Sequence, residues 1–221
     1  MSKDLKEHNL NRFNPTRAFI QMATARLMVG PFHYIHNRLK VTGRENVPKK
    51  GPFLVVSNHL SYYDPPIVVI SVDRPMGFIA KKELFTKAWL RNLINFFGAI
   101  QIDREKPSLS TMRAIKKVFQ AGWSVGIFIE GTRNKTPGTL GEPHLGPAYL
   151  AWTNRVPILP AGLLDTADTK KGAKVRFGKM IQPSADIEKT TWEIMASIGE
   201  LTGWALPERK RPAKGASAIE L

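Results

Sequence analysis

The chain of 221 residues contains no cysteine. Disulfide bonds, zinc–thiolate centres, iron–sulfur clusters and cysteine nucleophiles are therefore excluded. It also lacks a long apolar run, because the most apolar N-terminal stretch, residues 18–37, is interrupted by Arg26 and by Gly30-Pro31. A transmembrane helix needs about 20 mostly apolar residues, so we expect no membrane-spanning segment. We also expect no secretory signal peptide, since residues 1–17 are too polar for one.

Acidic side chains are scarce. The chain has 18 Asp and Glu against 33 Lys and Arg, which gives a formal net charge of +15. The excess is largest at the start, where residues 1–50 contain 10 basic and 3 acidic residues. Such a charge balance favours a polyanionic partner. Nucleic acid, an anionic lipid surface and an acidic carrier protein are all partners of this kind.

The N-terminal part, residues 1–40, begins with a polar stretch and continues with a helical pattern over residues 17–39. We expect a break in this helix near Gly30-Pro31. Two interpretations of the helix stay open: it packs on the core, or it lies in a membrane interface with its apolar side in the lipid. The apolar residues are Phe19, Ile20, Met22, Leu27, Met28, Phe32, Tyr34 and Ile35.

Residues 41–206 alternate between short apolar runs and helical periodicity, and a basic tail follows at 207–221. This alternation predicts a single α/β domain with a largely parallel central sheet flanked by helices. Ligands of such sheets bind beyond the carboxyl ends of the strands. The predicted strands are residues 53–57, 76–80, 99–102, 125–129, 156–163 and 174–180, and the predicted helices are 64–70, 81–97, 107–121, 148–153 and 186–202.

A histidine and an aspartate, His59 and Asp64, lie five positions apart just after the strand predicted at residues 53–57. A strand-to-helix turn can bring the Asp64 carboxylate onto the His59 ring and fix its tautomer. The other ring nitrogen can then take a proton from a hydroxyl group, as a general base does. However, Asp64 also stands where a helix N-cap is expected. The pair alone leaves both interpretations open.

Residues suited to binding an anion follow two further predicted strands. Gly131, Thr132 and Arg133 come after residues 125–129, and Arg104 comes after residues 99–102. A glycine allows close approach of the backbone, and threonine and arginine can bind an anion. Because parallel strands end at the same edge of a sheet, these residues are expected near His59, where they would hold a phosphate beside a base. Ordinary surface ion pairs are the alternative.

Residues 122–126 read Gly-Trp-Ser-Val-Gly and match the G-x-S-x-G pattern of the hydrolase nucleophile elbow. That elbow requires a strand, a turn and then a helix. Here the predicted order is helix, turn and strand. We therefore expect Ser124 at the opposite edge of the sheet from His59, and do not assign it as a nucleophile.

Four short motifs occur in one order: N-H-x-x-x-x-D at Asn58, His59 and Asp64, a glycine with an apolar strand and an arginine at residues 98–104, E-G-T-R at 130–133, and V-P-I-x-P at 156–160. Together they resemble the glycerolipid acyltransferase family, which includes the lysophosphatidate acyltransferases. The resemblance implies the α/β fold of that family and catalysis by His59 and Asp64. It also implies that Asn58, Lys81 and Glu130 belong to the substrate-binding site, with Lys81 on the phosphate of the acceptor.

The resemblance implies acyl transfer from acyl-CoA or acyl-carrier protein to a hydroxyl group, without a covalent acyl-enzyme, a metal or a cofactor. The leading acceptor is 1-acyl-glycerol-3-phosphate, which gives phosphatidic acid; glycerol 3-phosphate and other lysolipids are alternatives. Membrane lipids are then partners, and we expect a peripheral or monotopic protein on the cytosolic face of a membrane. The non-enzymatic alternative is a basic nucleic-acid-binding protein, but no recognition motif for nucleic acid is present.

Overall fold

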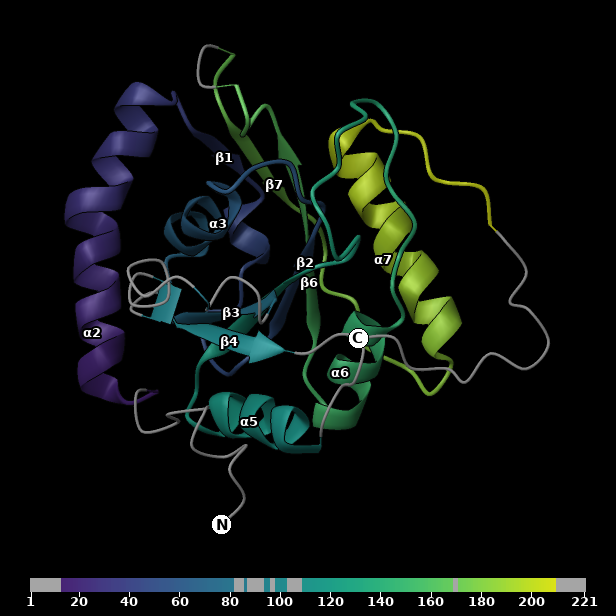
Figure 1. Cartoon of the computed structure of the whole chain (residues 1–221), viewed down its shortest axis with the longest axis horizontal. Helices are drawn as coiled ribbons and strands as arrows, with labels where there is room; N and C mark the ends of the chain where they lie inside the picture. The colour runs from purple at the N-terminus through teal and green to yellow at the C-terminus, as the bar shows by residue number, and fades with distance from the viewer. Residues whose placement is uncertain are drawn as a thin grey trace.

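The computed structural model describes residues 13–81, 86, 94–95, 98–102, 109–168 and 171–209. These residues form an α/β domain with helices on both faces of a mostly parallel sheet (Figure 1), as the alternating sequence pattern predicts. The predicted helix at 81–97 falls largely outside the described residues.

The described part of the sheet has seven strands in the order β1-β7-β6-β2-β5-β3-β4. All neighbouring pairs are parallel except β6 and β7, because the short connection at residues 165–173 is too short for a parallel crossover. The sequence pattern missed β1. The strands are β1 (Lys40–Thr42), β2 (Leu54–Ser57), β3 (Met76–Lys81), β4 (Ala99–Ile102), β5 (Ser124–Phe128), β6 (Ile158–Leu164) and β7 (Lys174–Phe177).

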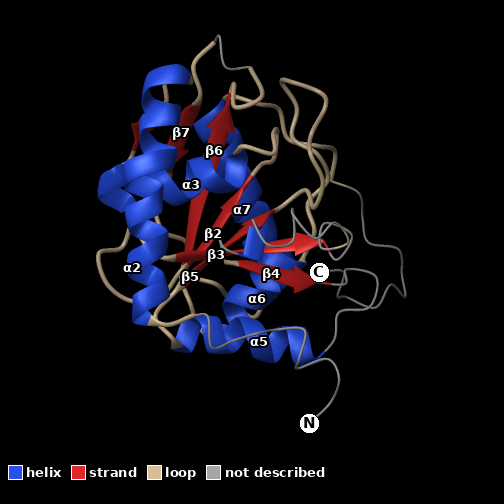
Figure 2. Ribbon diagram, turned by 60° about the vertical axis from the view of Figure 1, so that its left-hand side comes forward, coloured by secondary structure: helices blue, strands red, loops and turns tan. Residues whose placement is uncertain are grey.

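Helices cover the two faces of the sheet unequally (Figure 2). One face carries α5, α6 and α7, and the other carries α3 and, outside it, the N-terminal helix. The helices of this framework are α2 (Pro15–Thr24), α3 (Asp64–Val72), α5 (Leu109–Gln120), α6 (Gly146–Asn154) and α7 (Ile187–Thr202).

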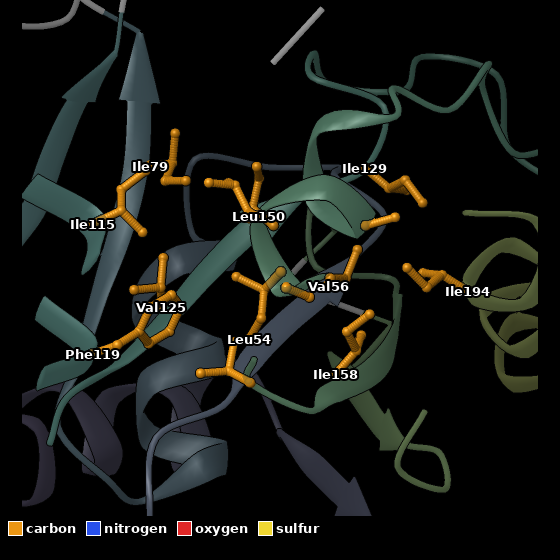
Figure 3. Close-up of a cluster of buried hydrophobic side chains, with 14 of the residues drawn as sticks. Leu54, Val56, Ile79, Ile115, Phe119, Val125, Ile129, Leu150, Ile158 and Ile194 are labelled. Carbon is orange, nitrogen blue, oxygen red and sulfur yellow. The ribbon is translucent and has the colours of Figure 1, made fainter. Parts of the chain in front are cut away.

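The core has two layers, one on each side of the sheet, and β2 contributes to both. Leu54 and Val56 point into the layer under α5, α6 and α7 (Figure 3), whereas Phe53 and Val55 point into the layer under α3. All four side chains are at most 1% exposed. A strand buried on both faces in this way is typical of a central parallel strand, and β2 therefore holds the loop that follows it on a rigid base.

The N-terminal segment is helical from Pro15 to His36 without the break predicted near Gly30-Pro31. Both residues have right-handed helical dihedrals, and a π-helical turn lies on each side of them: η2 (Ala25–Val29) and η3 (Phe32–His36). A proline removes one N–H donor and crowds the preceding turn. The wider π-helical turns accommodate it, so the helix continues where an α-helix would be expected to end.

One side of this helix is anchored to the domain. The amide of Gln21, which is 1% exposed, accepts from the Met76 backbone N–H and donates to the Met76 carbonyl oxygen. Arg26 forms an ion pair with Asp73 at the end of α3. The interpretation as a packed helix is therefore correct for this side.

The other side of the same helix presents large apolar side chains to solvent. Phe19, Leu27, Met28 and Ile35 are each more than 70% exposed. Within the described residues, no helix has both the length and the apolarity that crossing a bilayer requires. The helix thus has one packed side and one exposed apolar side.

Candidate active site

His59 and Asp64 lie in the connection between the carboxyl end of β2 and the start of α3. The His59 Nδ1 atom is 2.7 Å from the Asp64 Oδ2 atom. A carboxylate can only accept, so Nδ1 carries the hydrogen and Nε2 keeps the lone pair that can take a proton. The His59 side chain is 16% exposed, whereas that of Asp64 is fully buried.

The Asp64 side chain does not cap α3, which was the alternative interpretation of its position. Asp64 is itself the first residue of the helix, and its carboxylate turns back towards the preceding loop. There Oδ2 accepts from the backbone N–H groups of Leu60 (2.6 Å) and Ser61 (2.8 Å), and Oδ1 accepts from the Thr166 hydroxyl. The buried negative charge is therefore hydrogen-bonded at both oxygens.

The backbone of His59 is fixed by the loop that follows β5. Ser57 pairs with Phe128 in the sheet, so His59 and Glu130 emerge side by side two residues later. The His59 N–H donates to Glu130 Oε1 (3.2 Å), and its carbonyl oxygen accepts from the Asn134 N–H (2.6 Å).

The His59 imidazole also packs on an aromatic ring. It lies nearly parallel to Phe128, with ring centroids 3.8 Å apart and planes inclined by 9°. Phe128 in turn stacks against Phe78 of β3, with centroids 5.8 Å apart. The orientation of the imidazole is thus set by a bond at Nδ1 and by contact across its face.

Glu130 connects the two loops of the site. Besides the His59 N–H, it accepts from the Gly141 N–H at Oε2 (2.8 Å). The side chain is buried, and this burial raises the pKa of Glu130 above its ordinary value, although the bonds from Gly141 and His59 act in the opposite direction. The contacts of Glu130 are those of a residue that positions the His59 backbone.

Asn58 has a similar place in the fold. It is fully buried, its Nδ2 donates to the Leu163 carbonyl oxygen (2.9 Å), and its Oδ1 accepts from the Leu163 N–H (2.8 Å). Both ends of the amide are therefore engaged by the end of β6. This arrangement favours a structural role for Asn58 over the direct substrate contact expected from the motif.

Three cations are expected to bind an anion: Lys81, Arg104 and Arg133. Of these, Arg133 is the one whose side chain lies within the described part of the chain. Its guanidinium carbon lies 3.8 Å from the centre of the Tyr62 ring, within the loop that carries His59. Gly131 has a φ of +64°, which a glycine adopts without strain, and Thr132 is exposed. An open hollow of about 620 Å³ is lined by residues 130, 132–135 and 141–144. It lies directly beside the loop of His59.

Two further residues of the expected site cannot be placed by their side chains. For Lys81 the structure gives the backbone, which ends β3 beside Ile102, and Arg104 lies outside the described residues. Ser124 is fully buried at the amino end of β5, where its Oγ accepts weakly from the Phe53 N–H (3.4 Å). The pairing of Ser57 with Phe128 puts His59 at the other edge, so Ser124 is distant from the site, as predicted.

The sequence pattern gave no sign of three contacts in the site: Phe128 on His59, Tyr62 on Arg133, and Thr166 on Asp64. Phe128 and Tyr62 belong to stretches that the motifs include, but their ring contacts depend on the tertiary fold. Thr166 is separated from Asp64 by 102 positions in the chain. A search for polar residues at the end of each predicted strand would have included Thr166.

The arrangement can perform general-base chemistry at Nε2 of His59, beside a cation that can bind an anion. A buried carboxylate stabilises the imidazolium that forms when Nε2 takes a proton. The neighbouring guanidinium can hold a phosphate group with charge-assisted hydrogen bonds.

Comparisons with known proteins address the family. A sequence profile described as acyltransferase matches residues 38–164. A 1-acyl-sn-glycerol-3-phosphate acyltransferase of Borreliella burgdorferi is 31% identical over 131 residues, 58% of this chain and 52% of that protein. A Bacillus subtilis protein of the same name is 29% identical over 144 residues, 65% of this chain and 71% of that protein. The chain thus matches about half the length of the Borreliella protein.

A solved structure shows the same fold. The 1-acyl-sn-glycerophosphate acyltransferase from Thermotoga maritima superposes with a TM-score of 0.62 at 20% identity. The match covers 84% of this chain and 88% of the Thermotoga chain. The comparison therefore supports the α/β fold of this chain.

Glu130 predicts a pH dependence of stability. Because its pKa is raised on folding from an ordinary value of about 4.5, the folded state binds more protons than the unfolded state just above that pH. Its contribution therefore destabilises the fold as pH rises through the raised pKa. The stability advantage of the wild type over Glu130→Gln should shrink as the pH rises above about 4.5, in urea unfolding at constant ionic strength. The exposed Glu193→Gln is the control, and an advantage that stays constant with pH would contradict the assignment.

Proposed function

Because the chain belongs to the acyltransferase family, whose profile matches residues 38–164, we propose that it acylates a lysophospholipid. The donor is acyl-CoA or acyl-carrier protein. The proposed acceptor is 1-acyl-glycerol-3-phosphate and the product is phosphatidic acid, so the reaction is a step of phospholipid biosynthesis. The observation that carries the proposal is the His59–Asp64 pair, 2.7 Å apart, beside Arg133 at the carboxyl edge of the sheet.

In the proposed reaction His59 is the general base. Its Nε2 takes the proton of the acceptor hydroxyl as the hydroxyl oxygen attacks the carbonyl carbon of the thioester. The tetrahedral intermediate then collapses, the carbon–sulfur bond breaks, and the leaving thiolate takes the proton back from His59. Asp64 holds the ring in one tautomer and stabilises its charged form during the transfer.

The phosphate of the acceptor is assigned to Arg133, with Lys81 and Arg104 as further cations of the same site. The guanidinium carbon of Arg133 lies 3.8 Å from the centre of the Tyr62 ring, so a cation–π contact holds this cation beside the loop of His59. The planar N–H groups of a guanidinium fit two oxygens of a phosphate. Thr132 and the backbone at Gly131 complete the proposed anion site. Glycerol 3-phosphate and other lysolipids remain alternative acceptors, since all share this hydroxyl and phosphate chemistry.

The substrate is a lipid, and the exposed apolar side of the N-terminal helix supports a peripheral or monotopic attachment to the cytosolic face of a membrane. We assign residues 1–40 to this attachment, residues 41–206 to the acyltransferase domain and residues 207–221 to a basic tail. The net charge of +15 adds attraction to anionic lipids. It gives no reason to prefer nucleic acid, because the described site is built for acid–base chemistry.

The acyl-transfer proposal is tested by turnover of 1-acyl-glycerol-3-phosphate with acyl-CoA and with acyl-carrier protein, assayed separately. His59→Ala should lower kcat/KM by about 10²–10⁴-fold, the usual contribution of general-base catalysis. Asp64→Asn should also be severe, because an amide can donate to Nδ1 and favour the wrong tautomer. The surface variant Asp168→Asn is the matched control. A His59→Ala enzyme that keeps more than about a tenth of wild-type kcat/KM would show that His59 is not the base.

Phosphate recognition is tested at Arg133. A charge-assisted hydrogen bond contributes about 1.5–3 kcal/mol, so Arg133→Gln should reduce kcat/KM roughly ten- to hundredfold with a phosphorylated acceptor. The loss should be much smaller with the dephosphorylated acylglycerol, measured in the same detergent. Arg113→Gln on the exposed side of α5 is the control. Equal losses on both acceptors would exclude a phosphate contact by Arg133.

Membrane attachment is tested by co-sedimentation with vesicles of anionic and of neutral lipid. Burying one large apolar side chain contributes at most about 1.5–3 kcal/mol, so replacing Phe19, Leu27 and Ile35 together by Ser should weaken binding more than tenfold. Turnover of a short-chain, water-soluble acceptor should fall far less than vesicle binding. Trp152→Ser on α6 removes an exposed ring elsewhere and serves as control. If the triple variant binds as the wild type does, the helix is not the attachment surface.

A further inference from the structure

Thr166 is the partner of Asp64 that lies furthest from it in the sequence. It belongs to the turn between β6 and β7, is 1% exposed, and its hydroxyl is hydrogen-bonded to Asp64 Oδ1. It lies two residues beyond the segment matched by the family profile and outside the four motifs. Its hydroxyl is nevertheless in direct contact with the carboxylate that orients the proposed base.

The two oxygens of Asp64 have unequal surroundings. Oδ2 accepts from His59 Nδ1 and from two backbone N–H groups of its own loop, those of Leu60 and Ser61. Oδ1 accepts from Thr166. An ionised carboxylate has no hydrogen, so the hydroxyl is the donor in this bond. Thr166 is therefore the group that holds the second oxygen and fixes the rotation of the carboxylate about its Cβ–Cγ bond.

The fold gives the hydroxyl of Thr166 a defined position. Leu163, three residues earlier, is bonded through its N–H and its carbonyl to the amide of Asn58, next to His59. Asp165 adopts a φ of +58° and pairs with Lys174 of β7 at 2.8 Å. The turn is thus attached both to the catalytic loop and to the neighbouring strand.

We propose that Thr166 is a positioning residue for acyl transfer, which acts by holding Asp64 against His59. The proposal rests on the function proposed for His59 as general base. The hydroxyl has two effects. It keeps Oδ2 directed at Nδ1, and it takes up part of the negative charge of the carboxylate, which moderates the bond from Asp64 to the imidazole.

Removing the hydroxyl should change catalysis in a specific way. Thr166→Val keeps the shape but leaves Oδ1 buried without its donor. Loss of a hydrogen bond to a charged group predicts a fall in kcat of roughly ten- to hundredfold, with KM for the acceptor changed by less than about threefold. The carboxylate then interacts more strongly with the imidazolium. The acid limb of the kcat/KM profile should therefore move to higher pH.

Matched variants separate this role from a merely structural one. Thr166→Ser keeps the donor and should retain at least about a third of wild-type kcat, with an unmoved acid limb. Thr191 is equally buried, and its hydroxyl bonds the Ile187 carbonyl within α7, so Thr191→Val measures the cost of losing a buried hydroxyl far from the site. It should lower the unfolding midpoint without changing the pH profile. Thr166→Ala, which adds no volume, is the second hydroxyl-free variant should Val not fold.

The outcomes distinguish this proposal from the one on which it rests. If His59→Ala abolishes turnover and the hydroxyl-free variants keep more than half of wild-type kcat, the role of Thr166 is refuted while the base stands. The role of Thr166 is also refuted if the Ser, Ala and Val variants lose kcat equally and the acid limb of the kcat/KM profile stays in place in all three. If His59→Ala retains turnover, the proposed function itself is wrong.

Discussion

The burial of one ionised carboxylate is the constraint on which the site depends. Asp64 is fully buried, and a buried charge is tolerated only when hydrogen bonds replace the water that it has lost. The fold provides them from three directions: the imidazole of His59, the backbone of the loop before α3, and the turn after β6. The start of α3, with the positive end of its dipole, lies at the same point. The hydrogen bonds that stabilise the charge of Asp64 therefore also orient His59.

The site joins segments that are distant in the chain. The pairing of β2 with β5 sets Glu130 beside the His59 backbone, and the pairing of β2 with β6 sets Leu163 beside Asn58. The side chains of Glu130 and Asn58 both form hydrogen bonds with backbone groups. These two motif residues therefore hold the loops of the site together. Because β5 and β6 both pair with β2, a shift of either strand would move the loop that carries the His59 imidazole. The motif is thus better understood as a set of contacts between three strand ends than as a local sequence.

The sequence allowed prediction of the features that depend on local patterns. Alternation of apolar runs predicted the α/β sheet, and the spacing of His59 and Asp64 predicted their contact. It did not reveal that the Asp64 side chain turns back from the helix that Asp64 begins, because an aspartate at a helix start can be either an N-cap or an orienting carboxylate. The bond from Thr166 to Asp64 could not be predicted, although Thr166 follows a predicted strand, because a contact across 102 positions has no local signature. The continuous helix at Pro31 depends on π-helical turns, which the spacing of apolar residues does not encode.

The loop between His59 and Asp64 also joins the proposed chemistry to the proposed membrane surface. Tyr62 and Tyr63 of this loop are 68% and 45% exposed. Tyr62 contacts Arg133. Tyr63 makes a T-shaped ring contact, with centroids 5.8 Å apart, to His33 of the helix whose outer side is apolar. Tyrosine suits the boundary between lipid and water because its ring is apolar and its hydroxyl is polar. A lipid whose chain stays in the bilayer would then present its headgroup at the depth of these rings. The short path from helix to tyrosines to arginine would let His59, whose side chain is 16% exposed, act on the proposed lipid substrate while its chain stays in the membrane.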